Sequence, residues 1–192
     1  MKNMKHIAFL SAALILSVVG FGQTWSVDKA HSQLGFSVAH LSISEIYGAF
    51  RTFDSKITSS KDDFSDASVE LTADVNSINT GIDQRDNHLK SPDFFDAAKF
   101  NTLTFKSTSF KKTGAKKFQV TGDLTLHGIT KPVTLDVTFN GTTVNPQSKK
   151  TLAGFKISGI IKRTDFGIAT SFPAAMLGDD VSLLANAEFA KD

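Results

Sequence analysis

The sequence predicts a mainly β protein of about eight antiparallel strands with one short helical insertion. Two observations carry this prediction: long stretches alternate between apolar and polar residues, and short turn sequences separate many of them. A third is that only the stretch Asp83–Asp96 has a clear helical character. A sheet of eight strands either folds into a sandwich or closes into a barrel, and a closed barrel of this size can hold one small ligand.

The expected strands occupy the ranges 25–40, 46–57, 67–75, 103–107, 118–126, 133–139, 153–161 and 181–189. Alternation is cleanest in 67–75, where apolar residues take every second position. The spacing of Phe50 and Phe53 breaks the alternation of the second strand and indicates a bulge there. Glycines inside the strands are expected where the sheet bends sharply; they are Gly35, Gly122 and Gly159.

The helical insertion is predicted from its start and stop signals. Thr80 can act as the N-cap, and Asp83 follows three residues later, as in a capping box. Pro92 should end the helix, because the residue before a proline is pushed out of the helical region. A short charged helix among strands suggests a lid on the β-structure.

One face of this helix is expected to turn toward the cavity. Arg85, His88 and Leu89 are spaced i, i+3 and i+4, so they share that face. Asp86 points about 100° away, so it need not serve the same partner as Arg85. If Leu89 turns inward, the two charged side chains come with it and reach the ligand head group.

The first residues predict export. Met1–Lys5 is basic, Ile7–Phe21 is mostly apolar, and small residues follow at a plausible cleavage site before Gln23. The alternative is a membrane anchor, but the apolar run is shorter than the ~20 residues that a spanning helix needs. We therefore expect a signal peptide over 1–22 and a single domain over 23–192. We also expect that the protein is not an integral membrane protein.

Charge and cysteine content narrow the function classes. Cleavage would remove Lys2 and Lys5 from the 21 basic residues, so basic and acidic residues would then balance at 19 each. Such a balance gives no basic face for nucleic acid. The chain has no cysteine, so export would proceed without disulfides. The 17 phenylalanines can fill a core or line a pocket for a long apolar ligand.

Few residues point to catalysis. The sequence has no phosphate-binding loop and no Gly-x-Ser-x-Gly elbow. Beyond the signal segment its histidines are His31, His40, His88 and His127, and none has the spacing of a typical zinc site. We therefore predict no catalytic residue, no metal site and no cofactor; a metal site whose ligands come together only in the folded protein stays open as an alternative. His40 shares the apolar parity of its strand, either as a core histidine or as a polar group inside a cavity.

Two arginine–aspartate elements remain, Arg85-Asp86 and Arg163-x-Asp165. An arginine beside an apolar cavity can hold a phosphate or carboxylate with two parallel hydrogen bonds. The alternative is an ion pair that pins the helix to the barrel rim.

Several motifs, taken together, resemble the YceI-like family of polyisoprenoid-binding periplasmic proteins. The matching pieces are Asp28-x-x-His31-Ser32-x-x-x-Phe36-x-Val38-x-His40, Gly48-x-Phe50-x-x-Phe53, Arg85-Asp86-x-His88-Leu89-x-Ser91-x-x-Phe94-Phe95-Asp96, Thr104-Phe105-x-Ser107, Gly122-x-Leu124-Thr125-Leu126-His127-Gly128-x-Thr130-Lys131-Pro132-Val133 and Arg163-x-Asp165-Phe166-Gly167. The chain departs from the family at Asp54, where a glycine is usual, and at Asn101, where a proline is frequent.

The resemblance implies an eight-stranded antiparallel lipocalin-like β-barrel that holds a long-chain amphiphile, polyisoprenoid or fatty-acid-like, with its head near the mouth. The function so implied is periplasmic binding, transport or storage of that lipid, without catalysis. The residues expected to bind the ligand are Phe36, Val38, His40, Phe50, Arg85, His88, Leu89, Phe94, Phe95, Phe105, Leu124, Leu126, Val137, Phe139, Phe155, Ile157, Arg163 and Phe166.

Two other functions stay open. One is a hydrolase or other enzyme on such lipids, in which Arg85, Asp86, His88 and His40 would perform acid–base chemistry. The other is an envelope stress protein whose barrel interior is packed solid. A homodimer is possible, although no interface pattern is visible.

Overall fold

The structure, a computed structural model, describes residues 22–192. The predicted signal peptide, apart from Gly22, therefore lies outside the described residues. Within them the strands are β1 (Gln23–Val27), β2 (Gln33–His40), β3 (Ser44–Phe50), β4 (Phe53–Ser59), β5 (Ser68–Asp74), β6 (Ile78–Asn79), β7 (Thr102–Gly114), β8 (Lys117–Leu126), β9 (Ile129–Val144), β10 (Thr151–Lys162) and β11 (Leu177–Lys191).

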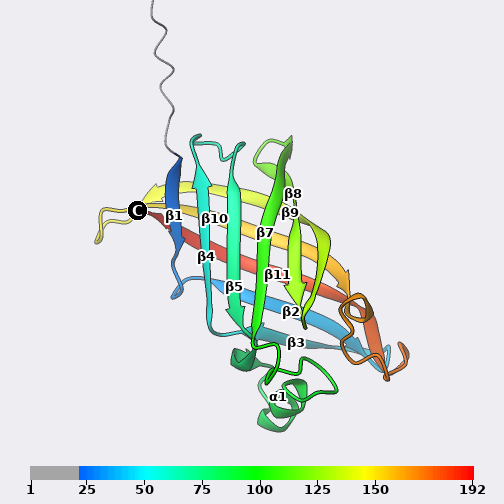
Figure 1. Cartoon of the computed structure of the whole chain (residues 1–192). Helices are drawn as coiled ribbons and strands as arrows, with labels where there is room; N and C mark the ends of the chain where they lie inside the picture. The colour runs from blue at the N-terminus through cyan, green and yellow to red at the C-terminus, as the bar shows by residue number, and fades with distance from the viewer. Residues whose placement is uncertain (1–21) are drawn as a thin grey trace, which may run out of the picture.

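The strands form a closed antiparallel barrel. Hydrogen-bonded neighbours follow the order β1-β4-β5-β7-β8-β9-β10-β11, and β11 pairs back with β1 to close a ring of eight strands. Figure 1 shows β4, β5 and β7 on the near side, crossing the strands of the far side at a steep angle. The mainly β prediction and the eight-stranded barrel are confirmed, and the sandwich alternative is wrong.

The first two predicted strands are each interrupted. β1 and β2 both pair with β11 but at different heights, and β3 pairs with β2 while β4 pairs with β1. β1 and β2 together thus make one barrel strand that is broken in the middle, and β3 and β4 together make the next. The irregular spacing of Phe50 and Phe53 falls at the break between β3 and β4, where the sequence predicts a bulge.

Gly122 shows why a strand glycine is needed at a bend. A Cβ added there would lie 2.5 Å from the carbonyl oxygen of Lys106 and 2.5 Å from the Phe105 ring. The ladder between β7 and β8 shifts register beside it, between Ser107 and Ser109. The Phe105 ring thus occupies the space above the glycine, and a larger residue would push it out of the barrel wall.

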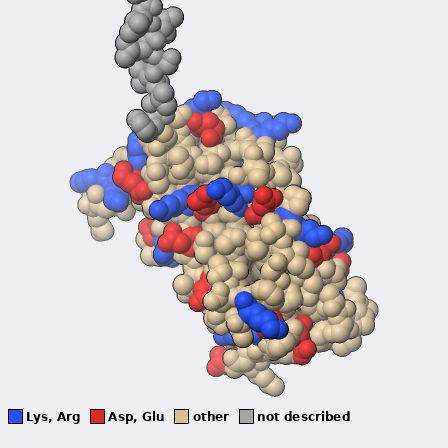
Figure 2. All heavy atoms as spheres, viewed as in Figure 1, with Lys and Arg blue, Asp and Glu red and all other residues tan. Residues whose placement is uncertain are grey.

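Charges of both signs alternate across the outer face of the near strands. Lys56 of β4 lies opposite Glu70 of β5, which lies opposite Lys106 of β7, which lies opposite Asp123 of β8. Lys106 Nζ is 3.0 Å from Glu70 Oε1. Figure 2 shows this row of alternating colours over the middle of the barrel. Opposite charges on facing positions favour this register over a slipped one.

The helix α1 (Asp83–Leu89) lies below the barrel, between β6 and β7. It ends before Pro92, as predicted, with Lys90 as its C-cap. The predicted N-cap is wrong: Ile82 takes that position, without a side-chain cap. Thr80 is instead engaged with Asp86, its hydroxyl donating to Asp86 Oδ1 over 2.5 Å.

Two 3₁₀ helices, η1 (Val75–Ser77) and η2 (Arg163–Phe166), complete the regular structure. In the part of the chain that is described, no helix is both long and apolar enough to cross a membrane.

Candidate functional site: an apolar cavity in the barrel

A cavity of about 240 Å³ runs inside the barrel. Its wall collects the inward-facing side chains of alternating strands, such as Val69 and Leu71 of β5. Among residues 22–192, only Gln33, Ser55 and Arg163 contribute polar side chains to the lining. Ser55 Oγ already donates to the carbonyl oxygen of Glu70 over 2.8 Å. The cavity therefore suits an apolar chain and offers little to a polar group.

One end of the cavity is sealed by Phe64. This side chain comes from the loop between β4 and β5 and has no exposed surface. Its ring lies 5.2 Å from Trp25, 5.1 Å from Phe139 and 5.1 Å from Phe155, measured between ring centroids. Aromatic pairs at these tilted and edge-on geometries add to the stabilisation from burial.

The opposite end is covered by α1 and the segment after it. Leu89, Phe94 and Phe95 line the cavity there. Leu89 and Phe95 are only partly buried, although both pack against the core. The Phe95 ring meets Phe50 of β3 edge-on, with a centroid distance of 6.1 Å. The expected position of the helical insertion, flanking the cavity, agrees with this placement.

Most of the residues predicted to bind ligand line this cavity: Phe36, Val38, Phe50, Leu89, Phe94, Phe95, Phe105, Leu124, Leu126, Val137, Phe155, Ile157 and Arg163. Their binding role stays a prediction. Phe139 and Phe166 are buried outside the lining, Phe139 among the rings around Phe64. The carbonyl oxygen of Phe166 is 2.9 Å from Nδ1 of His127, which holds η2 against the β8–β9 turn.

The predicted interior position of His40 is wrong. It is exposed, because it is the last residue of β2 and lies beyond the part of the strand that faces the cavity. Val38 and Phe36, which share its parity, do line the cavity. Alternation thus gave the correct face for these two positions but could not show where the cavity ends.

The predicted inward orientation of Arg85 and His88 is also wrong. Arg85 turns back to Thr80, donating from Nε to the hydroxyl at 2.7 Å and from Nη2 to the carbonyl at 2.8 Å. His88 is exposed, with its ring edge-on to Phe94 and Nε2 3.7 Å from Asp93. Leu89 alone on this face lines the cavity.

Asp86 and Arg85 serve one partner after all. The buried Asp86 carboxylate accepts from the backbone nitrogen of Thr80 at 2.8 Å as well as from its hydroxyl. Thr80 is thereby gripped by both charged side chains, which ties the start of α1 to the strand before it. With Asp86 buried and His88 exposed, the residues considered for acid–base chemistry do not converge.

Arg163 lines the cavity but has no donor to spare. Its guanidinium group donates to the backbone carbonyls of Gly178, Ile168, Ala169, Phe172 and Leu177, which uses all five of its N–H bonds. The alternative of an ion pair with Asp165 does not form either, because carbonyls take all five donors and Asp165 is exposed. This buried arginine holds the segment before β11 together with the start of β11, and it cannot also bind a phosphate.

Several lining residues escaped the sequence-based prediction, among them Phe53, Val69, Leu71, Phe110, Leu135 and Leu183. Most obey the same alternation as the predicted ones, so the signal was present. Phe64 was missed for another reason: it lies in a polar loop. A single phenylalanine among serines and aspartates was the available signal.

A separate polar cluster lies outside the cavity. Nδ1 of His31 is 2.9 Å from Oδ2 of Asp28, and Glu188 of β11 lies beside them. The hydrogen bond to the Asp28 carboxylate raises the pKa of His31 above its ordinary value. The same bond lowers the pKa of Asp28. The sequence gives no hint of the third member, because Glu188 lies near the other end of the chain.

Comparison with known proteins agrees with this architecture. UPF0312 protein SAB2563 of Staphylococcus aureus is 40% identical over 170 residues, which cover 86% of this chain and 96% of the relative. The crystal structure of the Campylobacter jejuni YCEI protein is 36% identical, with a TM-score of 0.72 over 86% of this chain and 95% of that one.

A more distant structure shares the fold. It is described as a polyisoprenoid binding domain from Saccharophagus degradans and is 17% identical, with a TM-score of 0.64 over 88% of this chain and 99% of that one. Residues 25–189 match the YceI-like domain, which covers nearly the whole barrel. The chain therefore belongs to the YceI-like family.

Proposed function

We propose that this protein binds a long-chain amphiphilic lipid, polyisoprenoid or fatty-acid-like, with the apolar tail inside the barrel. The observation that carries the proposal is the cavity lining, in which the described part of the chain places only three polar side chains, Gln33, Ser55 and Arg163. Each tail methylene that leaves water contributes about 0.8 kcal/mol, so affinity needs no polar contact. The description of the Saccharophagus neighbour as a polyisoprenoid binding domain supports the same ligand class.

The size of the cavity limits how much lipid it accommodates. Its volume of about 240 Å³ is slightly below the ~300 Å³ at the lower end of ligand pockets. A long tail would therefore displace lining side chains or extend out of the barrel. Leu89 and Phe95 are partly buried lining side chains, and they come from a short helix and the segment after it, not from the strands of the barrel. We place the entry of the tail at their end.

The head group would remain outside the apolar wall. Arg163 has all of its donors engaged, and Arg85 is turned to Thr80. Neither supplies a free cation to the cavity, so binding should not depend on an anionic head. With the predicted signal peptide, this describes a periplasmic carrier or store of lipid. The family and its neighbours point to a binding protein, in keeping with a role without catalysis.

The proposal is tested with a substitution that fills the cavity and should therefore prevent lipid binding. Leu71→Trp would place an indole in the space that a tail would occupy, since Leu71 is partly buried and lines the cavity. The matched control is Thr72→Trp, one residue further along β5 and exposed on the outer face. Native mass spectrometry of freshly purified protein and titration with a fluorescent polyisoprenol are the two measurements.

We expect a co-purified lipid mass in the parent and in Thr72→Trp, and at least a tenfold loss of affinity in Leu71→Trp. Equal affinity in all three proteins would overturn the proposal. So would the absence both of a co-purified lipid and of uptake of polyisoprenols and fatty acids by the parent, which would favour the packed-barrel alternative.

A further inference from the structure

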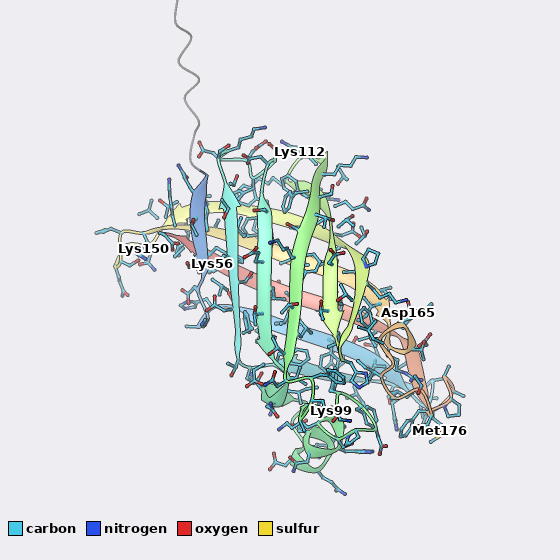
Figure 3. All side chains as sticks on the ribbon, viewed as in Figure 1. Lys56, Lys99, Lys112, Lys150, Asp165 and Met176 are labelled. Carbon is cyan, nitrogen blue, oxygen red and sulfur yellow. The ribbon has the colours of Figure 1, made fainter. Side chains whose placement is uncertain are left out.

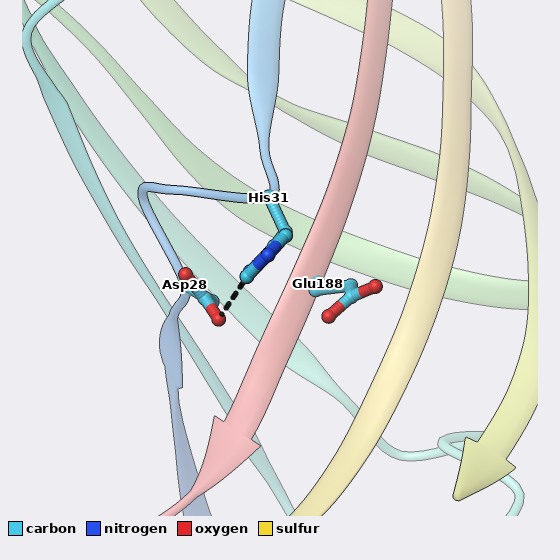
Figure 4. Close-up of side chains that lie close together, drawn as sticks. All are labelled: Asp28, His31 and Glu188. Carbon is cyan, nitrogen blue, oxygen red and sulfur yellow. Dashed lines mark hydrogen bonds and ion pairs between the residues drawn. The ribbon is translucent and has the colours of Figure 1, made fainter. Parts of the chain in front are cut away.

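Three potential metal ligands converge on the outside of the barrel. Asp28 and His31 belong to the turn between β1 and β2, and Glu188 belongs to β11 (Figure 4). One ligand atom from each residue can be chosen such that all lie within 4.8 Å of one another. Two carboxylates and one imidazole form a donor set that Zn²⁺ and similar transition-metal ions accept.

The backbone around these ligands is held in place independently of their side chains. The backbone nitrogen of Asp28 donates to the carbonyl of Glu188 at 2.8 Å, which joins the turn directly to β11. Ser32 reinforces the connection, because its hydroxyl accepts from the nitrogen of Glu188 at 3.0 Å and donates to its carbonyl at 3.3 Å. The three side chains therefore project from a fixed frame, as a metal site requires.

A recess lined by both polar and apolar residues adjoins the cluster. It has a volume of about 410 Å³ and is lined by His31 and Glu188 together with Asn140, Thr142 and Asn186 among others. An ion held by the three side chains would therefore face a space in which water can complete its coordination. This opening distinguishes the cluster from an ion pair on a flat surface.

We propose that Asp28, His31 and Glu188 bind a divalent transition-metal ion, with Zn²⁺ as the representative case. Zinc bonds to nitrogen and oxygen measure about 2.0–2.2 Å, so its ligand atoms lie roughly 3–4 Å apart. The His31–Asp28 separation of 2.9 Å is close to this spacing, and the Glu188 carboxylate, which has an oxygen within 4.8 Å of both other ligand atoms, would move closer to complete the set. The metal would replace the proton shared by His31 and Asp28, so binding would release it.

Because of where the cluster lies, a bound metal ion would also affect the stability of the barrel. β11 pairs with β1 through Phe189–Lys191 and with β2 through Leu177–Asn186, and Glu188 lies in the gap between these ladders. The neighbouring Ala187 and Phe189 line the lipid cavity. A metal ion here would bridge the break in the first barrel strand and should raise the thermal stability. This inference does not rest on lipid binding.

The experiment uses purified protein stripped with a chelator, then titrated with Zn²⁺ or Mn²⁺ alone by calorimetry at pH 7.5. The variants are His31→Gln and Glu188→Gln, both of which keep the backbone hydrogen bonds of the frame. His88→Gln is the matched control, since His88 is also an exposed histidine near a carboxylate, that of Asp93. The melting temperature with and without Zn²⁺ is the second measurement, and the metal-free melting temperature reports folding.

We expect one Zn²⁺ per chain, a rise in melting temperature on binding, and at least tenfold weaker binding in both cluster variants with His88→Gln unchanged. Mn²⁺ should broaden the NMR signals of Ala30, Ser32 and Ala187 before those of other residues. The assignment is overturned if the parent binds neither ion, or if His31→Gln and Glu188→Gln bind as tightly as the parent.

Discussion

The two ends of the barrel are closed in different ways. At one end Phe64 is fully buried among Trp25, Phe139 and Phe155. At the other end Leu89 of α1 and Phe95, which follows it, are only partly buried. The sealed end is built from side chains of strands and one loop, whereas the covered end is built from a seven-residue helix and the segment after it.

The two ends also differ in the side-chain contacts that hold them in place. The loop that carries Phe64 is fastened by Asp63, whose carboxylate accepts from Lys112 at 2.8 Å, and by Asp66, which accepts from the hydroxyls of Ser59 and Ser60. Figure 3 shows Lys112 at this end of the barrel and Lys99 at the helical end. A binding protein needs one end that opens at low cost, and the helical end fits that role.

The largest effect is expected from Phe64→Ala. Removing a fully buried phenylalanine costs about 3–5 kcal/mol of unfolding free energy, because the transfer energy is lost and a cavity remains. Phe95→Ala at the helical end should cost less than half as much, since Phe95 is only partly buried. Urea unfolding of both variants measures the difference. Equal losses would show that the two ends are equally important for stability.

Arg163→Met tests the segment between the barrel and β11. Five carbonyls lose their donor, and unsatisfied buried polar groups cost about 1–3 kcal/mol each when water cannot reach them. Water will reach some of them, so we expect a net loss of about 2–3 kcal/mol. Hydrogen exchange should rise selectively at the amides of Ile168, Phe172 and Leu177. Uniformly faster exchange across the barrel would contradict a local fastening role.

Much of the barrel could be predicted because strands carry a strong local signal. Alternation identified the inward face of β5 and β8, since each residue on a strand faces opposite to its neighbour. The closure of the barrel needed the pairing of β1 with β11, which are about 160 residues apart in the sequence, so it leaves no local signal. The resemblance to a family supplied that part.

The site was less predictable where a side chain has more than one partner within reach. Helical phase places Arg85 on the same face as Leu89, yet the Thr80 hydroxyl and carbonyl draw the guanidinium away. The Arg163 motif predicted an anion or a carboxylate, whereas five backbone carbonyls supply the contacts, three of them in the segment before β11 and two at the start of β11. In both cases an arginine pattern shows that a polar partner exists but does not show which one.

Arg85→Ala sharpens the comparison at the helical end. The substitution removes two hydrogen bonds to Thr80, which together hold α1 in place by about 1 kcal/mol. Without them α1 should detach more readily, and the ligand should be released roughly five times faster. The increase should be the same for anionic and neutral head groups. Lys90→Ala and His88→Ala are the controls, with His88 exposed, and stopped-flow displacement of a fluorescent lipid is the measurement. A selective loss for anionic lipids would show that Arg85 contacts the head group.

The smallest effect is expected from acid at the sealed end. Hydrogen bonding from Lys112 and then from Ser65 lowers the pKa of Asp63 from 3.8 to about 2, and hydrogen bonds from Ser59 and Ser60 lower the pKa of Asp66 as well. A carboxyl group with a lowered pKa in the folded state stabilises the fold above its unfolded pKa, and this contribution disappears as the pH falls through the folded value. Stability should therefore decline between about pH 4 and pH 2.

Because both carboxylates are largely exposed, screening by water keeps each contribution small. Asp66→Asn should reduce the slope of the urea midpoint against pH in this window, whereas Asp62→Asn, in the same loop but outside the hydrogen-bonded set, should not. Loosening this loop frees Phe64, so acid should also expose Trp25, and the tryptophan emission of the parent should shift to the red before global unfolding. If the emission instead changes only together with the global transition, the loop does not open by itself, and Phe64 belongs to the cooperative core.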